Sequence, residues 1–306
     1  MRECNTTKPT VTIAMSTYNR ADLLPRAIDS ILAQTFKDWQ LIVVDDCSPD
    51  NTREIMAKYI GKDKRIYYRR NKENIGSGKS KNPVMIQSEG KYIAILDDDD
   101  WWTPTYLEKL VFALETYPDS PLAYSDIIRV DTGGNEFYWN CSKGKPFPNI
   151  LPSATLMRGD TFRWLGGWDS ENFCRGYHAE ADYYVRVGGT SKFIHIAKPL
   201  VYATISPDAM SYNRRGNVEA LLLLIKKHKG TFNHKELALY YTRVALHSIE
   251  GNMGNKRYFA KAILTYPFIP EAWSGLMLSM IHRKLFLRGY TRYRKVLGYP
   301  PAQEYE

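Results

Sequence analysis

Short apolar runs alternate with helical segments over the first 125 residues, and this alternation limits the possible folds more than any other feature. The runs have the length and composition of strands buried on both faces, and they lie at residues 11–15, 41–44, 66–68, 92–96 and 122–124. Between them, residues 23–32 and 104–115 place apolar side chains at helical spacing. Because strand–helix–strand order favours parallel pairing, we predict an α/β fold with a mainly parallel sheet flanked by helices.

The rest of the chain changes character twice. Residues 126–205 are rich in Gly-Gly pairs and aromatics, which favours short strands and loops with one helix near 180–187. From residue 217 onward the pattern is helical, at 218–228, 235–249, 256–264 and 270–287. We therefore expect a domain of residues 1–215, with halves of about 9–125 and 126–215, and then a C-terminal helical appendage of residues 216–306.

Composition excludes several classes of protein. The four cysteines form no CxxC pair, which argues against a disulfide scaffold and a zinc ribbon. No apolar stretch reaches the ~18–20 residues that cross a bilayer, and residues 1–9 lack the apolar core of a signal peptide. We therefore expect a cytoplasmic protein, at most peripheral on the cytoplasmic face of a membrane. The net charge of +9 leaves nucleic acid, anionic lipid or a phosphate-bearing small molecule as partners.

Polar residues follow three of the predicted strands. Ser16–Arg20 follows the first, Asp45-Asp46 the second and Asp97–Asp100 the fourth. Ligands of open parallel sheets bind at the carboxyl ends of the strands. Four adjacent carboxylates repel one another, and a divalent cation would relieve that repulsion and neutralise a diphosphate leaving group. A solvated acidic turn is the alternative interpretation.

Two other functions are disfavoured by the same segments. Residues 76–80 look like the end of a P-loop, but the first glycine of that motif would fall at Glu73. A nucleic-acid-binding protein would need basic residues where these strands end in acid, which repels phosphate.

Several motifs resemble the family 2 glycosyltransferases. Residues 12–20 are similar to the opening strand of that family, and Gly166–Asp169 to its GGFD element. Further similar segments are 43–48, Asn74–Gly76 with Lys81-Asn82, the DxD segment 96–104, and the closing strand 199–202. They occur in order over about residues 9–215. The resemblance implies the GT-A fold, a nucleotide-binding α/β sheet merged with an acceptor-side region.

The resemblance also implies a set of donor-binding residues. Thr17, Tyr18, Asn19 and Arg20 would border the nucleotide. Asp45 or Asp46 would accept the uracil N3–H or bond the ribose, since a carboxylate is an acceptor-only group. Lys81 stands where the family commonly has an arginine, and a solvated lysine at a helix start is the alternative.

The DxD segment implies the metal site. Asp97 would face the ribose and help hold the metal, Asp99 would bind the metal on the diphosphate, and Asp98 occupies the variable position between them. Either Mn²⁺ or Mg²⁺ suits oxygen ligands. Asp100 is expected to be structural, for instance by bonding the start of the following helix.

An inverting transfer needs a general base, which the family places on a helix that also carries an arginine. Aligning that arginine with Arg186 gives Glu180 as the base, with Asp182 as the second candidate and Asp169 as the third. Residues two apart on a helix face different ways, so we expect one of Glu180 and Asp182 to be structural, for instance by pairing with Arg186.

The implied function is an inverting, metal-dependent transfer of sugar from a nucleotide sugar, with a UDP-sugar expected, to a hydroxyl of a cell-surface glycan or lipid-linked saccharide. Two alternatives stay open. The first is an enzyme of the same fold that glycosylates a polyprenyl phosphate. The second is an inactive binding or scaffold relative, because Ala179 stands where the family has an acidic residue.

The last predicted helix continues into a basic stretch. No acidic residue lies between Glu271 and Glu304, whereas the basic residues there are Arg283, Lys284, Arg288, Arg292, Arg294 and Lys295. Such a stretch can lie on an anionic membrane surface. Packing on the catalytic domain is the alternative.

Overall fold

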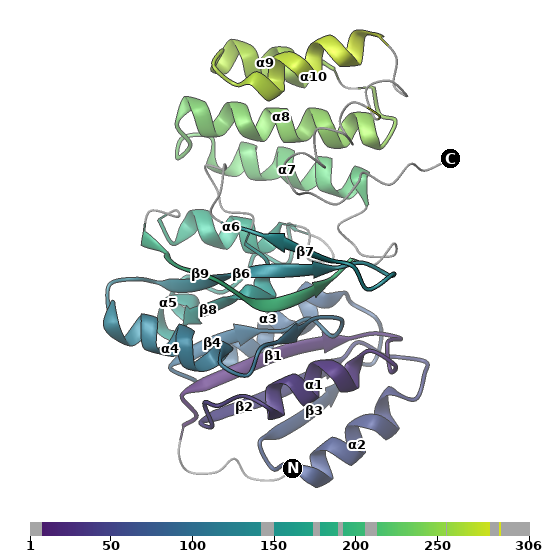
Figure 1. Cartoon of the computed structure of the whole chain (residues 1–306), viewed down its shortest axis with the longest axis vertical. Helices are drawn as coiled ribbons and strands as arrows, with labels where there is room; N and C mark the ends of the chain where they lie inside the picture. Colours follow the sequence, from purple (N-terminus) through teal and green to yellow (C-terminus); the bar gives the residue numbers. More distant parts are fainter. Residues whose placement is uncertain are drawn as a thin grey trace. The chain divides into compact units, whose positions relative to one another are not determined.

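The computed structural model describes residues 8–141, 150–173, 178–188, 192–205, 213–254, 256–281 and 288 (Figure 1). The chain divides into two compact units, of which the first ends at Thr204 and the second runs from Ile205 onward. The two domains expected from the sequence, divided at residue 215, remain a prediction.

A parallel sheet forms the first half of the first unit. Its strands are β1 (Val11–Thr17), β2 (Trp39–Asp45), β3 (Ile66–Arg70) and β4 (Tyr92–Ile95), in the order β3-β2-β1-β4. All residues of β1 and β4 are buried, as continuous apolar strands between two helical layers should be. The predicted parallel βα arrangement is confirmed here.

The sheet continues beyond β4 with mixed pairing. The further strands are β8 (Thr155–Arg158), β6 (Leu122–Val130), β9 (Ile194–Thr204) and β5 (Trp101–Trp102), with β7 (Glu136–Trp139) beside β6. β6 and β9 are parallel, but β8 pairs antiparallel with both β4 and β6. The sheet is therefore mixed in this half, and the parallel pairing expected from the strand–helix order holds here only for β6 and β9.

Helices of the first unit cover the sheet. They are α1 (Leu24–Leu32), α2 (Thr52–Lys62), α3 (Ser77–Gln87), α4 (Tyr106–Thr116), α5 (Gly159–Trp164) and α6 (Ala179–Arg186), and the single turn η1 (Pro152–Ala154) precedes β8. α3 begins at Ser77, directly after Gly76. Gly76 adopts a φ of 92° at its start, and the Asp46 carboxylate accepts the Gly76 N–H at 2.7 Å, which fixes where the helix begins.

The second unit is helical, as predicted. It contains α7 (Arg214–His228), α8 (His234–Glu250), α9 (Arg257–Thr265) and α10 (Pro270–Ile281), and each packs on the next. Asn233 and Glu236 form a capping box that starts α8. Arg214 bonds Glu250 at 2.9 Å, which ties the start of α7 to the end of α8. In the part of the chain that the structure describes, no helix has both the length and the apolarity to span a membrane.

Candidate active site

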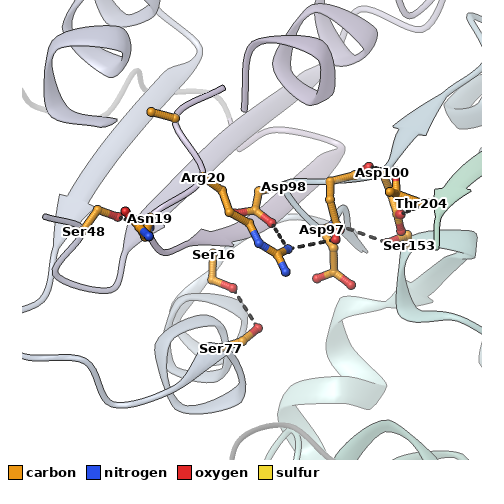
Figure 2. Close-up of polar contacts among 12 residues, drawn as sticks. Ser16, Asn19, Arg20, Ser48, Ser77, Asp97, Asp98, Asp100, Ser153 and Thr204 are labelled. Carbon is orange, nitrogen blue, oxygen red and sulfur yellow. Dashed lines mark hydrogen bonds and ion pairs between the residues drawn. The ribbon is translucent and has the colours of Figure 1, made fainter. Parts of the chain in front are cut away.

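The carboxyl ends of β1, β2 and β4 meet at one edge of the sheet. Thr17 lies opposite Asp45 in the β1–β2 register, and β4 runs beside β1 on its other side. The three polar segments that the sequence placed after these strands are therefore neighbours. Figure 2 shows the Arg20 side chain, which follows β1, directed at the acidic run that follows β4.

Asp45 and Asp46 are buried and bonded by donors of the chain itself. Asp45 Oδ2 accepts the Tyr68 hydroxyl at 2.6 Å and Arg70 at 2.8 Å, and its Oδ1 accepts the Ser48 N–H at 2.7 Å. A carboxylate offers about four acceptor positions, and these donors fill three of them on a side chain that has no exposed surface.

Asp46 organises the segment that leads into α3. Its carboxylate accepts the N–H groups of Ile75 at 3.0 Å and Gly76 at 2.7 Å, and the Asn71 amide at 2.8 Å. Ile75 and Tyr18 leave 40% and 45% of their surface exposed beside this segment. Two exposed apolar side chains next to a pair of buried carboxylates suit a flat ring that offers one polar edge.

The segment after β1 is held in an unusual backbone conformation. Asn19 has a φ of 54°, and its N–H donates to the Ser48 hydroxyl at 3.1 Å. Asparagine tolerates this left-handed region better than most residues. Thr17 is buried, and the turn at Asn19 directs Arg20 toward the end of β4.

Two cations of the chain pair with three carboxylates of the acidic run. Lys81, which is only 3% exposed, donates to Asp97 at 2.5 Å. Arg20 donates to Asp98 at 3.0 Å and to Asp99 at 2.8 Å. Lys81 is therefore a buried member of the cluster, and the alternative of a solvated lysine is wrong.

The fourth carboxylate is structural, but not in the way expected. Asp100 accepts the N–H of Thr204 at 3.0 Å, so it bonds the end of β9 and not the start of α4. The Thr204 hydroxyl also donates to the Asp99 carbonyl, which Arg26 reaches at 2.9 Å. The sequence offered no signal for Thr204 or Arg26, because both contacts join segments far apart in the chain.

Burial and pairing separate the pKa values of the four carboxyl groups. Burial raises the pKa of Asp98 to about 6, and burial with neighbouring carboxylates raises the pKa of Asp99 and Asp100. Burial alone would also raise the pKa of Asp97, but the ion pair and hydrogen bond with Lys81 lower it. Asp97 is therefore the one of the four whose pKa is lowered, and 38% of its side chain is exposed.

Glu180 and Asp182, the two candidate bases, have different surroundings. Glu180 is half-buried in the first turn of α6, and its charge interacts with Asp97 and Lys81. Burial raises its pKa to about 7, with the charge of Asp97 adding to the shift. Asp182 is fully buried and accepts from Arg186 at 2.8 Å, as the helical spacing suggested.

Asp169, the third candidate, forms hydrogen bonds with Asn172, three residues further along the chain. It accepts the side-chain amide of Asn172 at 2.9 Å and the Asn172 N–H at 3.2 Å. Of the three candidate bases, Glu180 is thus the one whose interactions join it to Asp97 and Lys81.

The carboxylates of the acidic run are the candidate ligands of a metal ion. Among the described residues, no three His, Cys, Asp or Glu side chains converge to hold an ion. A cation on a diphosphate usually takes one or two carboxylates, with phosphate oxygens and water completing its shell. Asp97, charged and partly exposed, fits that role. Asp99 fits it if the ion replaces Arg20 as the partner of its carboxylate.

Sequence comparison finds a matching family and similar proteins. A family model described as Glycosyl transferase family 2 matches residues 12–178, more than half of the chain. The uncharacterized glycosyltransferase MJ1057 of Methanocaldococcus jannaschii is 42% identical over 131 residues, or 42% of this chain and 45% of that protein. The UDP-Glc:alpha-D-GlcNAc-diphosphoundecaprenol beta-1,3-glucosyltransferase WfaP of Escherichia coli is 35% identical over 106 residues, or 35% of this chain and 41% of that protein. This chain thus spans less than half the length of either relative.

Structural comparison shows the fold. S. aureus TarS 1-349 in complex with UDP-GlcNAc has a TM-score of 0.65 at 17% identity, covering 95% of this chain and 89% of that one. The mannosyltransferase PcManGT from Pyrobaculum calidifontis, in complex with GDP-Man and Mn²⁺, has a TM-score of 0.56 at 14% identity, covering 95% and 88%. The likeness confirms the expected GT-A architecture.

Proposed function

This chain belongs to the family 2 glycosyl transferases, and on that basis we propose that it transfers a sugar from a UDP-sugar to an acceptor hydroxyl with inversion at the anomeric carbon. The acceptor oxygen attacks that carbon while Glu180 takes its proton. The bond from the anomeric carbon to the diphosphate breaks, and UDP leaves with the electron pair.

One observation carries this proposal. Glu180, Asp97 and Lys81 come from α6, the end of β4 and α3, and they interact at one place. A carboxylate with a pKa of about 7 is half deprotonated at neutral pH, and it is a stronger base than an ordinary glutamate. A buried lysine beside it adds positive charge where a leaving diphosphate would develop negative charge.

The donor assignment rests on the strand ends of β1 and β2. Asp45 keeps one acceptor position, which uracil would reach once that buried side chain is uncovered, and Tyr18 and Ile75 supply exposed apolar surface nearby. Uracil matches such an edge with its single ring N–H. The UDP-GlcNAc complex of TarS and the UDP-Glc donor in the name of WfaP support a UDP-sugar.

We propose Asp97 as the main metal ligand, with Asp99 as the second. When bound there, Mn²⁺ or Mg²⁺ would neutralise the diphosphate charge. Arg20, freed from Asp99, would remain within reach of the phosphates. The Mn²⁺ complex of PcManGT supports a divalent ion.

The name of one relative supports a class of acceptor. The name of WfaP gives a saccharide on diphosphoundecaprenol as its acceptor. We propose a cell-surface glycan or lipid-linked saccharide for this chain, with the transfer taking place in the cytoplasm.

The test is a UDP-release assay over a panel of UDP-sugars and saccharide acceptors. Glu180→Gln should lower the transfer rate by about 10²–10⁴-fold, since a positioned base contributes that much. For the unaltered protein the rate should rise with pH through about 7 and then level off, as Glu180 loses its proton. Thermal shift with UDP checks that the variant still binds the nucleotide.

The same variant separates the alternatives. A polyprenyl phosphate is already an anion and needs no base, so full activity of Glu180→Gln toward that acceptor would favour the polyprenyl-phosphate enzyme. UDP binding without turnover of any donor in the panel would favour the inactive relative.

A further inference from the structure

The second unit carries a cluster of exposed apolar side chains. Leu264 lies in the last turn of α9, Phe268 lies between the two helices, and Trp273, Met277 and Met280 belong to α10. The exposed fractions of these five residues run from 47% to 86%. We call these five residues the α10 face. In the first unit, by contrast, exposed large apolar residues such as Phe112 and Trp164 are far apart in sequence. Scattered exposure is ordinary, whereas a contiguous apolar surface marks an interaction site.

The α10 face is a regular surface of a packed helix. Trp273, Met277 and Met280 follow the spacing of four and three residues that places side chains on one side of a helix. The other side of α10 is buried: Ala272 is fully buried, and Gly275 lies so close to the Phe259 ring that an added Cβ would be 2.4 Å from it. The Trp273 indole donates to the Pro267 carbonyl at 2.7 Å, which holds the ring over the turn that carries Phe268.

The residues that flank this face in the sequence are rich in positive charge. Lys256, Arg257 and Lys261 are exposed on and beside α9. The sequence from 272 to 303 contains no acidic residue, and it holds the six basic residues between Arg283 and Lys295. Glu271, at the start of α10, is the nearest carboxylate in the sequence.

The charge decides which partner fits. A second copy of this chain would bring two basic segments together across a symmetric interface, and the like charges would repel. An anionic bilayer offers apolar depth for leucine, phenylalanine and methionine, a boundary layer that favours tryptophan, and negative headgroups for the lysines and arginines.

We propose that the α10 face docks on the surface of an anionic membrane. Trp273, Phe268 and the two methionines enter the boundary between headgroups and acyl chains, and the basic residues stay at the headgroups. The inference is independent of the proposed transfer, because vesicle binding needs neither donor nor acceptor.

The test is co-sedimentation of the full chain with vesicles of phosphatidylcholine alone or with one third phosphatidylglycerol. The unaltered chain should sediment with the anionic vesicles, and raising the salt concentration should weaken binding. Met277→Glu with Met280→Glu should lower the partition coefficient by about tenfold or more, because both side chains would leave the boundary layer. Both residues are exposed, so the substitutions do not disturb the core.

Phe112→Glu is the matched control, since Phe112 is an equally exposed apolar residue on α4 of the first unit. It should bind vesicles as the unaltered chain does. Equal binding by the double variant, or no binding by the unaltered chain, would overturn the proposal. A dimer in the unaltered chain that the double variant abolishes would assign the face to a second copy instead, and would overturn it too.

Discussion

The carboxylates after β4 differ in charge because they differ in partner. Asp97 has a buried lysine to itself, whereas Asp98 and Asp99 share one guanidinium. The pKa of Asp97 is lowered and those of Asp98 and Asp99 are raised. The carboxylate with the lowered pKa thus stands at the proposed metal position, and the raised pKa values of its neighbours reduce the repulsion along the run as the pH falls.

The pKa of Asp98 makes stability depend on pH. Its value of about 6 exceeds the ordinary 3.8, so the folded state holds a proton that the unfolded state has lost between these values, and stability falls as pH rises from about 4 to about 6. Asp98→Asn cannot ionise. Relative to the unaltered chain, its free energy of unfolding should therefore improve by up to about 3 kcal/mol between pH 4 and pH 7.5.

Urea denaturation at the two pH values measures this change. Asp131→Asn is the control, because hydrogen bonds from Asn135 lower the pKa of that exposed carboxyl group, so its effect should run in the opposite direction. An Asp98→Asn effect of the same size at both pH values would show that Asp98 is charged throughout.

The sequence predicted which residues gather at this site better than it predicted their contacts. Motif order identified Asp97, Lys81 and Glu180. It could not show that Arg20 spans Asp98 and Asp99, or that Thr204 bonds Asp100, because these contacts join segments 78 to 104 residues apart. Side-chain partners are decided by packing, which the linear pattern does not contain.

At the scale of elements, α3 is fixed to the loop after α5 by a reciprocal amide contact. Asn82 accepts the Trp168 N–H at 2.9 Å and donates to the Trp168 carbonyl at 2.8 Å. Arg186 of α6 adds bonds to the carbonyls of Leu165 and Gly167. The helix with Lys81 and the helix with Glu180 are therefore held through one loop.

Gly167 makes this close approach possible. Its φ is 72°, and an added Cβ would lie 2.5 Å from the Asn82 oxygen and 2.9 Å from Ile86. Gly167→Ala should therefore cost about 2–5 kcal/mol of unfolding free energy, from backbone strain and overpacking together. Chemical denaturation measures the loss.

Gly166 is a close control for that substitution. It has a φ of 74° but no atom within 4 Å of an added Cβ, so Gly166→Ala should cost only the strain of about 1–2 kcal/mol. Equal losses for the two variants would mean that the contact with α3 contributes nothing.

Strand and helix order was readable from sequence, and pairing direction was readable only in part. Continuous apolar runs with helices between them gave β1 to β4 and their parallel order. The run at 122–124 looks much like the earlier ones, yet β6 pairs antiparallel with β8. Local periodicity reports the burial of a strand and not the direction in which it pairs.

At the scale of the whole molecule, the acidic run and the basic stretch lie in different units. The acidic run and the buried pair Asp45 and Asp46 form the site of the first unit, and exposed lysines and arginines border the apolar face of the second. The net charge of +9 therefore says little about the chemistry. The basic stretch could be found from the sequence after Glu271 alone. The apolar face could be recognised only from the way α10 packs on α9.

Calorimetric titration of UDP, with and without Mn²⁺, tests the central claim that the strand ends of the first unit bind a nucleotide diphosphate through the acidic run. The unaltered chain should bind UDP more tightly with Mn²⁺. Asp97→Ala and Asp99→Ala should each weaken that metal-dependent binding by about tenfold or more, and Glu180→Gln should retain it. The account would be contradicted if the unaltered chain did not bind UDP. It would also be contradicted if Asp97→Ala bound UDP with Mn²⁺ as tightly as the unaltered chain does.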